Sequence, residues 1–129
     1  MYYLVMKIML ISEKMFLDKL PLIKFNIKKH TALLPTFELG KISKYSNTEK
    51  EILDKDIEIL KKSDSLLVCN FDKSLTKNFV GSYCLIMMGI AYSLGKRIYL
   101  LYDTPNTQNK DKIKALEVIP LKGNLKEIR

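Results

Sequence analysis

The sequence predicts an α/β fold with three layers, in which a five-stranded, mostly parallel sheet lies between two layers of helices. Two observations predict it. Continuous apolar runs, typical of strands covered on both faces, recur along the chain, and segments with helical spacing or capping residues separate them. With 129 residues, 47% of them hydrophobic, and no repeat or long linker, we expect a single domain over residues 1–129.

Local signals place the individual elements. Pro21 is expected to kink or divide a helix over residues 13–29. Thr48 and Glu51 form a capping box that starts the next helix, and Gly95 ends the one after it. The predicted strands span residues 3–11, 31–34, 65–71, 97–102 and 118–121, and the last two predicted helices span residues 78–94 and 110–116. Right-handed crossovers between these strands predict a flavodoxin-like or Rossmann-like sheet.

The charge of the chain is high but dispersed. Lys and Arg number 22 against 14 acidic residues, for a formal net charge of +8. Lysines occur along the whole chain, often beside Glu or Asp, and no Arg-rich tract or interleaving of Arg with aromatic residues is present. We therefore expect a solvated lysine surface and no nucleic-acid partner.

Two cysteines and the apolar N-terminus suggest where the protein works. Cys69 and Cys84 lie in apolar segments without metal-ligand spacing, so we expect buried free thiols, a reducing cytoplasm, and neither a metal nor another cofactor. The first 11 residues lack the features of a signal peptide, and Lys7 interrupts them. They are also shorter than the ~20 residues that span a bilayer, so no membrane association is expected.

Polar residues follow the predicted strands and define a candidate crevice. Parallel sheets bind ligands beyond the carboxyl ends of their strands, so side chains at these positions are expected to lie together. The residues concerned are Ser12, Glu13, Thr36, Glu38, Asn70, Asp72 and Asp103. His30, the only histidine, precedes the second strand and is expected at the opposite edge of the sheet.

Several motifs between residues 28 and 129 resemble one enzyme family. The motifs are Asp56-x7-Asp64, the strand end Asn70-Phe71-Asp72-Lys73, the segment Asn78-Phe79-Val80-Gly81, the helical pattern Gly89-x-Ala91-Tyr92-x-Leu94-Gly95-Lys96, and His30-Thr31-Ala32-Leu33-Leu34-Pro35. Together they look like the nucleoside 2-deoxyribosyltransferase family, which includes deoxynucleoside-monophosphate N-glycosidases. The resemblance is strongest over residues 56–102.

The resemblance implies cleavage of the bond between a deoxyribose and its base by a glutamate on the third helix. That glutamate precedes the glycine of a Glu-x-Gly-x-Ala pattern by two residues, and here Met87 occupies the position. A thioether cannot carry the negative charge that an oxocarbenium-like transition state needs. We therefore predict a nucleoside-binding or nucleotide-binding protein in which cleavage or transfer is lost or weak, a pseudoenzyme of the family.

The resemblance also suggests the residues that contact the ligand. Asp56 matches the aspartate that orients the substrate, although a solvated helix carboxylate is its simpler interpretation. Ser12 keeps a hydroxyl where relatives hold a phosphate or sugar, but the adjacent Glu13 would repel a phosphate unless Lys14 offsets it. Gly81 and Ser82 open a helix whose amides suit a phosphate or a ribose hydroxyl.

Other roles for the polar residues, and two other functions for the protein, are consistent with the sequence. Asn70 and Asp72 are candidate ligand contacts or turn formers, and Asp72 is the best candidate to replace the missing carboxylate. Asp64 is interpreted as a turn residue. The chain could instead be a divergent active enzyme that uses Asp72, Glu38 or a residue of a partner chain, or a non-catalytic interaction module. By the resemblance, a homodimer is expected.

Overall fold

A parallel sheet of five strands forms the centre of the protein, in the order β2-β1-β3-β4-β5. The computed structural model describes residues 4–36 and 48–129, so Glu38 lies outside the described residues. All four neighbouring strand pairs are parallel. The strands are β1 (Lys7–Ile11), β2 (Thr31–Leu33), β3 (Ser65–Val68), β4 (Arg97–Leu100) and β5 (Ile119–Pro120). This is the flavodoxin-like order, and it confirms the predicted fold class.

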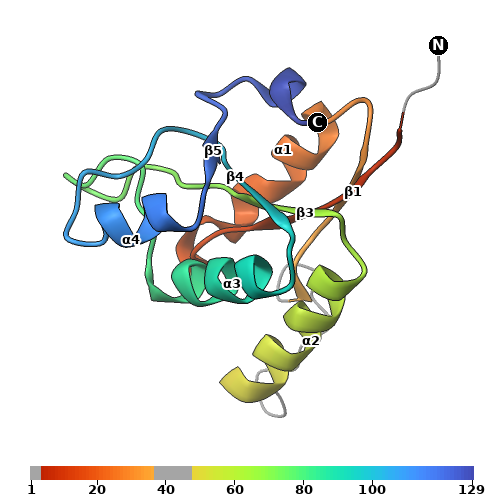
Figure 1. Ribbon diagram of the computed structural model, residues 1–129, viewed down its shortest axis with the longest axis horizontal. Coiled ribbons are helices and arrows are strands. Elements are labelled where there is room, and N and C mark those ends of the chain that lie inside the picture. Colours follow the sequence, from red (N-terminus) through yellow and green to blue (C-terminus); the bar gives the residue numbers. More distant parts are fainter. Residues whose placement is uncertain (1–3, 37–47) are drawn as a thin grey trace.

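Helices cover both faces of the sheet, as Figure 1 shows for α1 on one side and α3 on the other. The helical elements are η1 (Lys14–Lys19), α1 (Leu20–Asn26), α2 (Glu49–Lys61), α3 (Ser82–Ser93), α4 (Lys110–Ala115) and η3 (Leu125–Glu127). Pro21 lies in the first turn of α1, where its missing N–H costs no helical hydrogen bond. The proline therefore separates the 3₁₀ helix η1 from α1, as the sequence predicted.

Alternate residues of the buried strands supply two apolar cores. Met9, Ile11, Leu66 and Val68 pack with α2, α3 and α4 on one face of the sheet. Ile8, Leu10, Leu67 and Tyr99 pack with α1 and the C-terminal segment on the other. Both faces of β1 and β3 are thus covered, which explains why these strands are continuous apolar runs rather than alternating ones.

Element ends differ from the sequence predictions by a few residues, and backbone geometry explains the difference at the start of α3. Asn78 has a φ of 56°, in the left-handed region, so α3 begins only at Ser82 and not at residue 78. Thr48 caps α2 as predicted, because its hydroxyl oxygen accepts the Glu51 N–H at 3.2 Å. Gly95, with a φ of +71°, follows the end of α3 as predicted.

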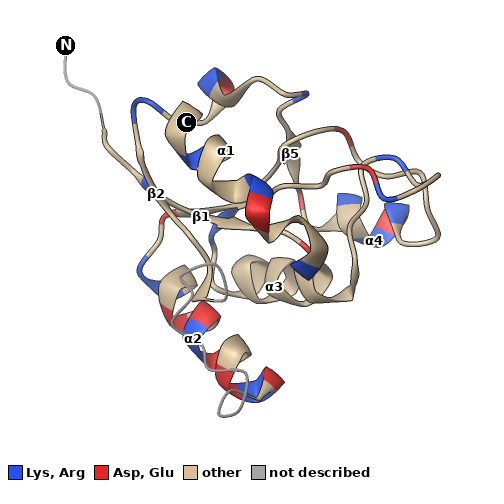
Figure 2. Cartoon of the chain, turned by 180° about the vertical axis from the view of Figure 1, so that it is seen from behind, with Lys and Arg blue, Asp and Glu red and all other residues tan. Residues whose placement is uncertain are grey.

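The surface charge is spread over many elements, as Figure 2 shows. Acidic and basic residues alternate along α2, whereas α3 carries no charged residue at all. Cys69 and Cys84 are buried free thiols, as predicted. Within residues 4–36 and 48–129, no helix has the length and apolarity needed to cross a membrane.

Candidate functional site

A pocket of about 320 Å³ opens where β1 ends, between the first turn of α3 and one side of α2. In this sheet order β1 connects to β2 on one side, whereas the neighbouring β3 connects to β4 on the other side. Ligands of parallel α/β folds bind at such a switch point. The volume falls within the range of small-molecule sites. The lining residues are Ile11, Ser12, Glu13, Lys14, Leu17, Pro35, Glu49, Ile52, Asp56, Ser82, Tyr83 and Ile86.

Asp56 is a buried carboxylate that joins three parts of the pocket wall. Its side chain points inward from α2, and the residue is only 1% exposed. The Thr36 backbone N–H donates to Oδ1 at 2.8 Å, and the Tyr83 hydroxyl donates to Oδ2 at 2.5 Å. These contacts tie the chain after β2 and the first turn of α3 to α2. Asp56 is therefore no solvated surface residue but a fixed acceptor beside the pocket.

Tyr83 is held as a hydrogen-bond donor. Burial of the phenol, together with its hydrogen bond to Asp56, raises the pKa of Tyr83 far above its usual value. The hydroxyl therefore stays protonated at neutral pH. Asp56 and Tyr83 thus form a hydrogen-bonded carboxylate and phenol among the residues that line the pocket.

Glu13 supplies a second carboxylate, at the N-terminus of α3. Its Oε2 atom accepts the backbone N–H of Cys84 at 3.0 Å. A Cβ placed on Gly81 would lie 2.3 Å from Glu13 Oε1, so only glycine at this position leaves room for the carboxylate. A negative charge is stabilised here by the free amides and the positive end of the helix dipole. Glu13 thus acts as a cap that the chain itself provides for α3.

Three other residues that the sequence singled out border the pocket. Ser12 is buried and donates from its hydroxyl to the Glu13 backbone oxygen at 3.0 Å, and Ser82 lies exposed at the first turn of α3. Gly81 forms the N-cap of that helix. Ser12, Ser82 and Asp56 thus line one pocket, and Gly81 directly precedes Ser82.

Asn70 and Asp72 are directed elsewhere. Asn70 is fully buried, donates to the Asp103 backbone oxygen at 2.8 Å and accepts the Tyr102 N–H at 2.9 Å, so it ties the chain after β3 to the chain after β4. Asp72 is exposed and accepts the Asn78 N–H at 2.9 Å. Both side chains bind the backbone of nearby loops, and neither lines the pocket.

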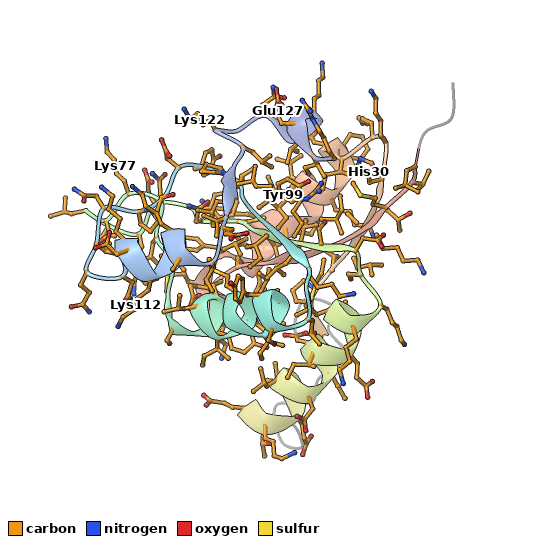
Figure 3. The ribbon with its side chains drawn as sticks, viewed as in Figure 1. His30, Lys77, Tyr99, Lys112, Lys122 and Glu127 are labelled. Atoms are coloured by element: carbon orange, nitrogen blue, oxygen red, sulfur yellow. The ribbon has the colours of Figure 1, made fainter. Side chains whose placement is uncertain are left out.

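Met87 and His30 lie away from the pocket lining. Met87 is 0% exposed and packs in the apolar core between α3 and the sheet. His30 accepts the Met6 N–H at its Nδ1 atom, just before β1 begins. Figure 3 shows His30 on the opposite side of the molecule from Lys77, which lies in the segment after β3, as expected for the two edges of a parallel sheet.

A second, larger hollow of about 540 Å³ lies beside β4 and β5 and contains Arg97 and Tyr99. Figure 3 shows Tyr99, Lys122 and Glu127 on the side of the ribbon away from α3. Arg97 and Tyr99 both donate to the Arg129 backbone oxygen at 2.5 Å. Their polar atoms are thus engaged within the chain, and the hollow lies away from the switch point. The smaller pocket is the better candidate site.

Sequence reasoning underrated Glu13 and missed Tyr83. Glu13 was expected at the crevice and as a charge that would repel phosphate, but its contact with α3 was not predicted, because the two partners lie 71 residues apart along the chain. The available signal was Gly81, a glycine directly before the helix, but a glycine does not identify the side chain that fills the space beside it. Tyr83 gave no signal, because a tyrosine in an apolar helix is usually a packing residue.

A comparison with a solved structure supports the fold. No family model matches the chain, and no curated protein matches it. Among solved structures, a conserved protein from Enterococcus faecalis V583 is similar with a TM-score of 0.56 and 21% identity, covering 88% of this chain and 76% of that one. The 2-deoxyribosyltransferase of Bacillus psychrosaccharolyticus is similar over 73% of this chain and 70% of its own, with a TM-score of 0.49 and 20% identity.

Proposed function

We propose that the pocket binds a nucleoside-like small molecule and that efficient cleavage of an N-glycosidic bond has been lost. The observation that carries the proposal is the buried Asp56 carboxylate, held by Thr36 and Tyr83 on a pocket at the switch point of the sheet. A carboxylate in such a place accepts hydrogen bonds from hydroxyl or N–H groups of a ligand, while apolar Ile52 and Ile86 contact its rings. The sequence resemblance to nucleoside 2-deoxyribosyltransferases supplies the ligand class.

Loss of turnover is inferred from Met87. In the resembling family this position carries the nucleophilic glutamate, and here the methionine is buried in the core. Removing a covalent nucleophile costs roughly 10⁴ to 10⁶ in rate in well-studied hydrolases. Asp72 is a poor replacement for that glutamate, because its carboxylate accepts the Asn78 backbone N–H and the residue does not line the pocket. Any remaining cleavage by the described residues of this chain would have to use one of the three carboxylates that line the pocket, Glu13, Glu49 or Asp56.

A ligand-induced shift in melting temperature tests binding. The four 2′-deoxynucleosides are added to the protein, and a ligand at 100 times its dissociation constant is expected to add about 2.7 kcal/mol of stability. Asp56→Asn should abolish the shift. Asp54→Asn is the matched control, because Asp54 lies on the exposed face of the same helix, paired with Lys50 at 2.6 Å. No shift with any nucleoside, or equal shifts in the two variants, would contradict the proposal.

Release of free base, followed by chromatography on the same samples, tests the loss of turnover. We expect none above the level of a buffer blank. Base release by the unmodified protein that Glu13→Gln or Asp56→Asn removes would favour the alternative, a divergent active enzyme. Neither binding nor release would favour a non-catalytic interaction module.

We also propose that the protein is a cytoplasmic homodimer. Helix α3 lacks charged residues on every side, a pattern typical of helices that are covered all round, yet Ile86 and Tyr92 are each 51% exposed. A second copy packed on this face would bury them and border the pocket through Ile86. Light scattering after gel filtration should give twice the chain mass, and Tyr92→Lys should give a monomer. A monomeric unmodified protein would contradict the proposal.

A further inference from the structure

The position that could hold a phosphate in this pocket is already filled by a carboxylate of the chain. The Glu13 Oε2 atom accepts the Cys84 N–H at 3.0 Å, at the end of α3 where the helix dipole favours a negative charge. The bare Cα of Gly81 leaves the space that Glu13 occupies, since a Cβ there would lie 2.3 Å from Oε1 and 2.4 Å from the carboxyl carbon. The missing side chain at Gly81 therefore leaves the space in which the Glu13 carboxylate lies.

The charges around this position also disfavour an anion. Among the described lining residues, Glu13, Glu49 and Asp56 are acidic, and Lys14 is basic. A phosphate that reached the α3 amides would have to displace one carboxylate and approach the others. Like charges a few ångströms apart repel strongly where water is partly excluded. A neutral ligand meets no such cost, and its hydroxyl or N–H groups can donate to the carboxylates.

We infer that Glu13 is a specificity-determining residue, which closes the α3 N-terminus to phosphate so that the pocket takes unphosphorylated nucleosides and rejects their 5′-monophosphates. The inference deepens the proposed function and rests on it. The Glu13 carboxylate excludes phosphate in two ways: its negative charge repels an anion, and its side chain fills the space at the α3 amides. Removing the charge and removing the side chain should therefore have separate effects on phosphate binding.

Two variants separate these effects. Glu13→Gln removes the charge but keeps an oxygen that can accept the Cys84 N–H, and Glu13→Ala empties the space beside Gly81. Glu58→Gln and Glu58→Ala are the matched controls, because Glu58 is exposed on α2 and does not line the pocket. Dissociation constants are measured by calorimetry for each 2′-deoxynucleoside and its 5′-monophosphate.

The unmodified protein is expected to bind a nucleoside at least about tenfold more tightly than its monophosphate, the effect of roughly one charge at a partly buried helix N-terminus. Glu13→Gln should reduce this preference for the nucleoside over its monophosphate, and Glu13→Ala should reduce it further or reverse it. The Glu58 variants should keep the preference of the unmodified protein. Equal or tighter binding of the monophosphate by the unmodified protein would overturn the inference. A preference for the nucleoside that neither Glu13 variant changes would also overturn the inference.

A second probe keeps the inference separate from the proposed function. Inorganic phosphate should raise the melting temperature of Glu13→Ala more than that of Glu58→Ala, since only the former frees the α3 amides. If no nucleoside or monophosphate binds any variant, the proposed function fails, and with it the selection of nucleosides. The phosphate comparison still decides whether Glu13 closes the α3 N-terminus to phosphate. A larger phosphate effect in Glu13→Ala supports it, and equal effects in the two variants overturn it.

Discussion

The Tyr83 hydroxyl donates a hydrogen bond to Asp56 Oδ2 over 2.5 Å, and this contact joins α3 to α2 at the wall of the pocket. Asp56 is almost fully buried, and its other described contact is the Thr36 backbone N–H. The pair is thus both part of the fold and part of the candidate site. The contribution of the Asp56–Tyr83 pair to stability can be measured separately from its contribution to ligand binding.

Tyr83→Phe should lower the free energy of unfolding by about 1–3 kcal/mol, because it leaves one oxygen of a buried carboxylate without its donor. Urea denaturation gives the value. Tyr102→Phe is the control, since the exposed Tyr102 lies outside α3 and its proposed dimer face and should change stability by less than about 0.5 kcal/mol. Equal effects of the two changes would show that the contact with Asp56 adds nothing to stability.

Gly81→Ala should destabilise the protein by about 1 kcal/mol, because the new methyl group would displace the carboxylate that caps α3. The loss should largely disappear in a Glu13→Ala background, giving a coupling energy above about 0.5 kcal/mol in a double-mutant cycle. Gly89→Ala should instead stabilise by about 0.5–1 kcal/mol, since nothing lies within 4 Å of its new Cβ in the middle of the helix. If the effects of the Gly81 and Glu13 changes on the free energy of unfolding were additive, the Glu13 carboxylate would not depend on the space at Gly81.

Met87→Glu should cost more than about 3 kcal/mol, because it places a carboxyl group in an apolar core without a partner. Met87→Leu, a change of similar volume, should cost less than about 1.5 kcal/mol. Denaturant titration of both variants provides the comparison. A Met87→Glu protein as stable as the unmodified one would mean that this side chain reaches the pocket or solvent.

Stability should fall as the pH rises above about 8.5. Burial raises the pKa of the Cys69 thiol, and burial followed by the nearby Glu13 carboxylate raises that of Cys84. In the unfolded chain both thiols ionise near their usual pKa, so above that pH the unfolded state binds fewer protons and is favoured. Each thiol should therefore remove about 1 kcal/mol between pH 7.5 and 9.5.

The comparison for this pH effect is a Cys69→Ala/Cys84→Ala protein, whose stability should change less over the same interval. Urea titrations at the two pH values measure both proteins. A matching pH dependence in the two would show that the thiols do not contribute. The test is independent of any ligand.

The sheet was predictable because its signals are local. The apolar runs that form β1 and β3 and the cap at Thr48 each depend on a few adjacent residues. The limits of α3 were less predictable, because the left-handed backbone at Asn78 is decided by the loop that Asp72 and Asn70 hold in place. Element ends depend on such non-local hydrogen bonds.

By itself, the sequence determined the α/β class, the crevice at the carboxyl edge, and the absence of a glutamate at position 87. Tertiary structure decided which polar side chains enter the pocket. Asn70 and Asp72 follow a strand as Glu13 does, yet they bind loop backbone, whereas Glu13 crosses to α3 and Asp56 turns inward to Tyr83. The reason is physical: a buried polar group points toward whichever partner satisfies it, and that partner can lie 71 residues away.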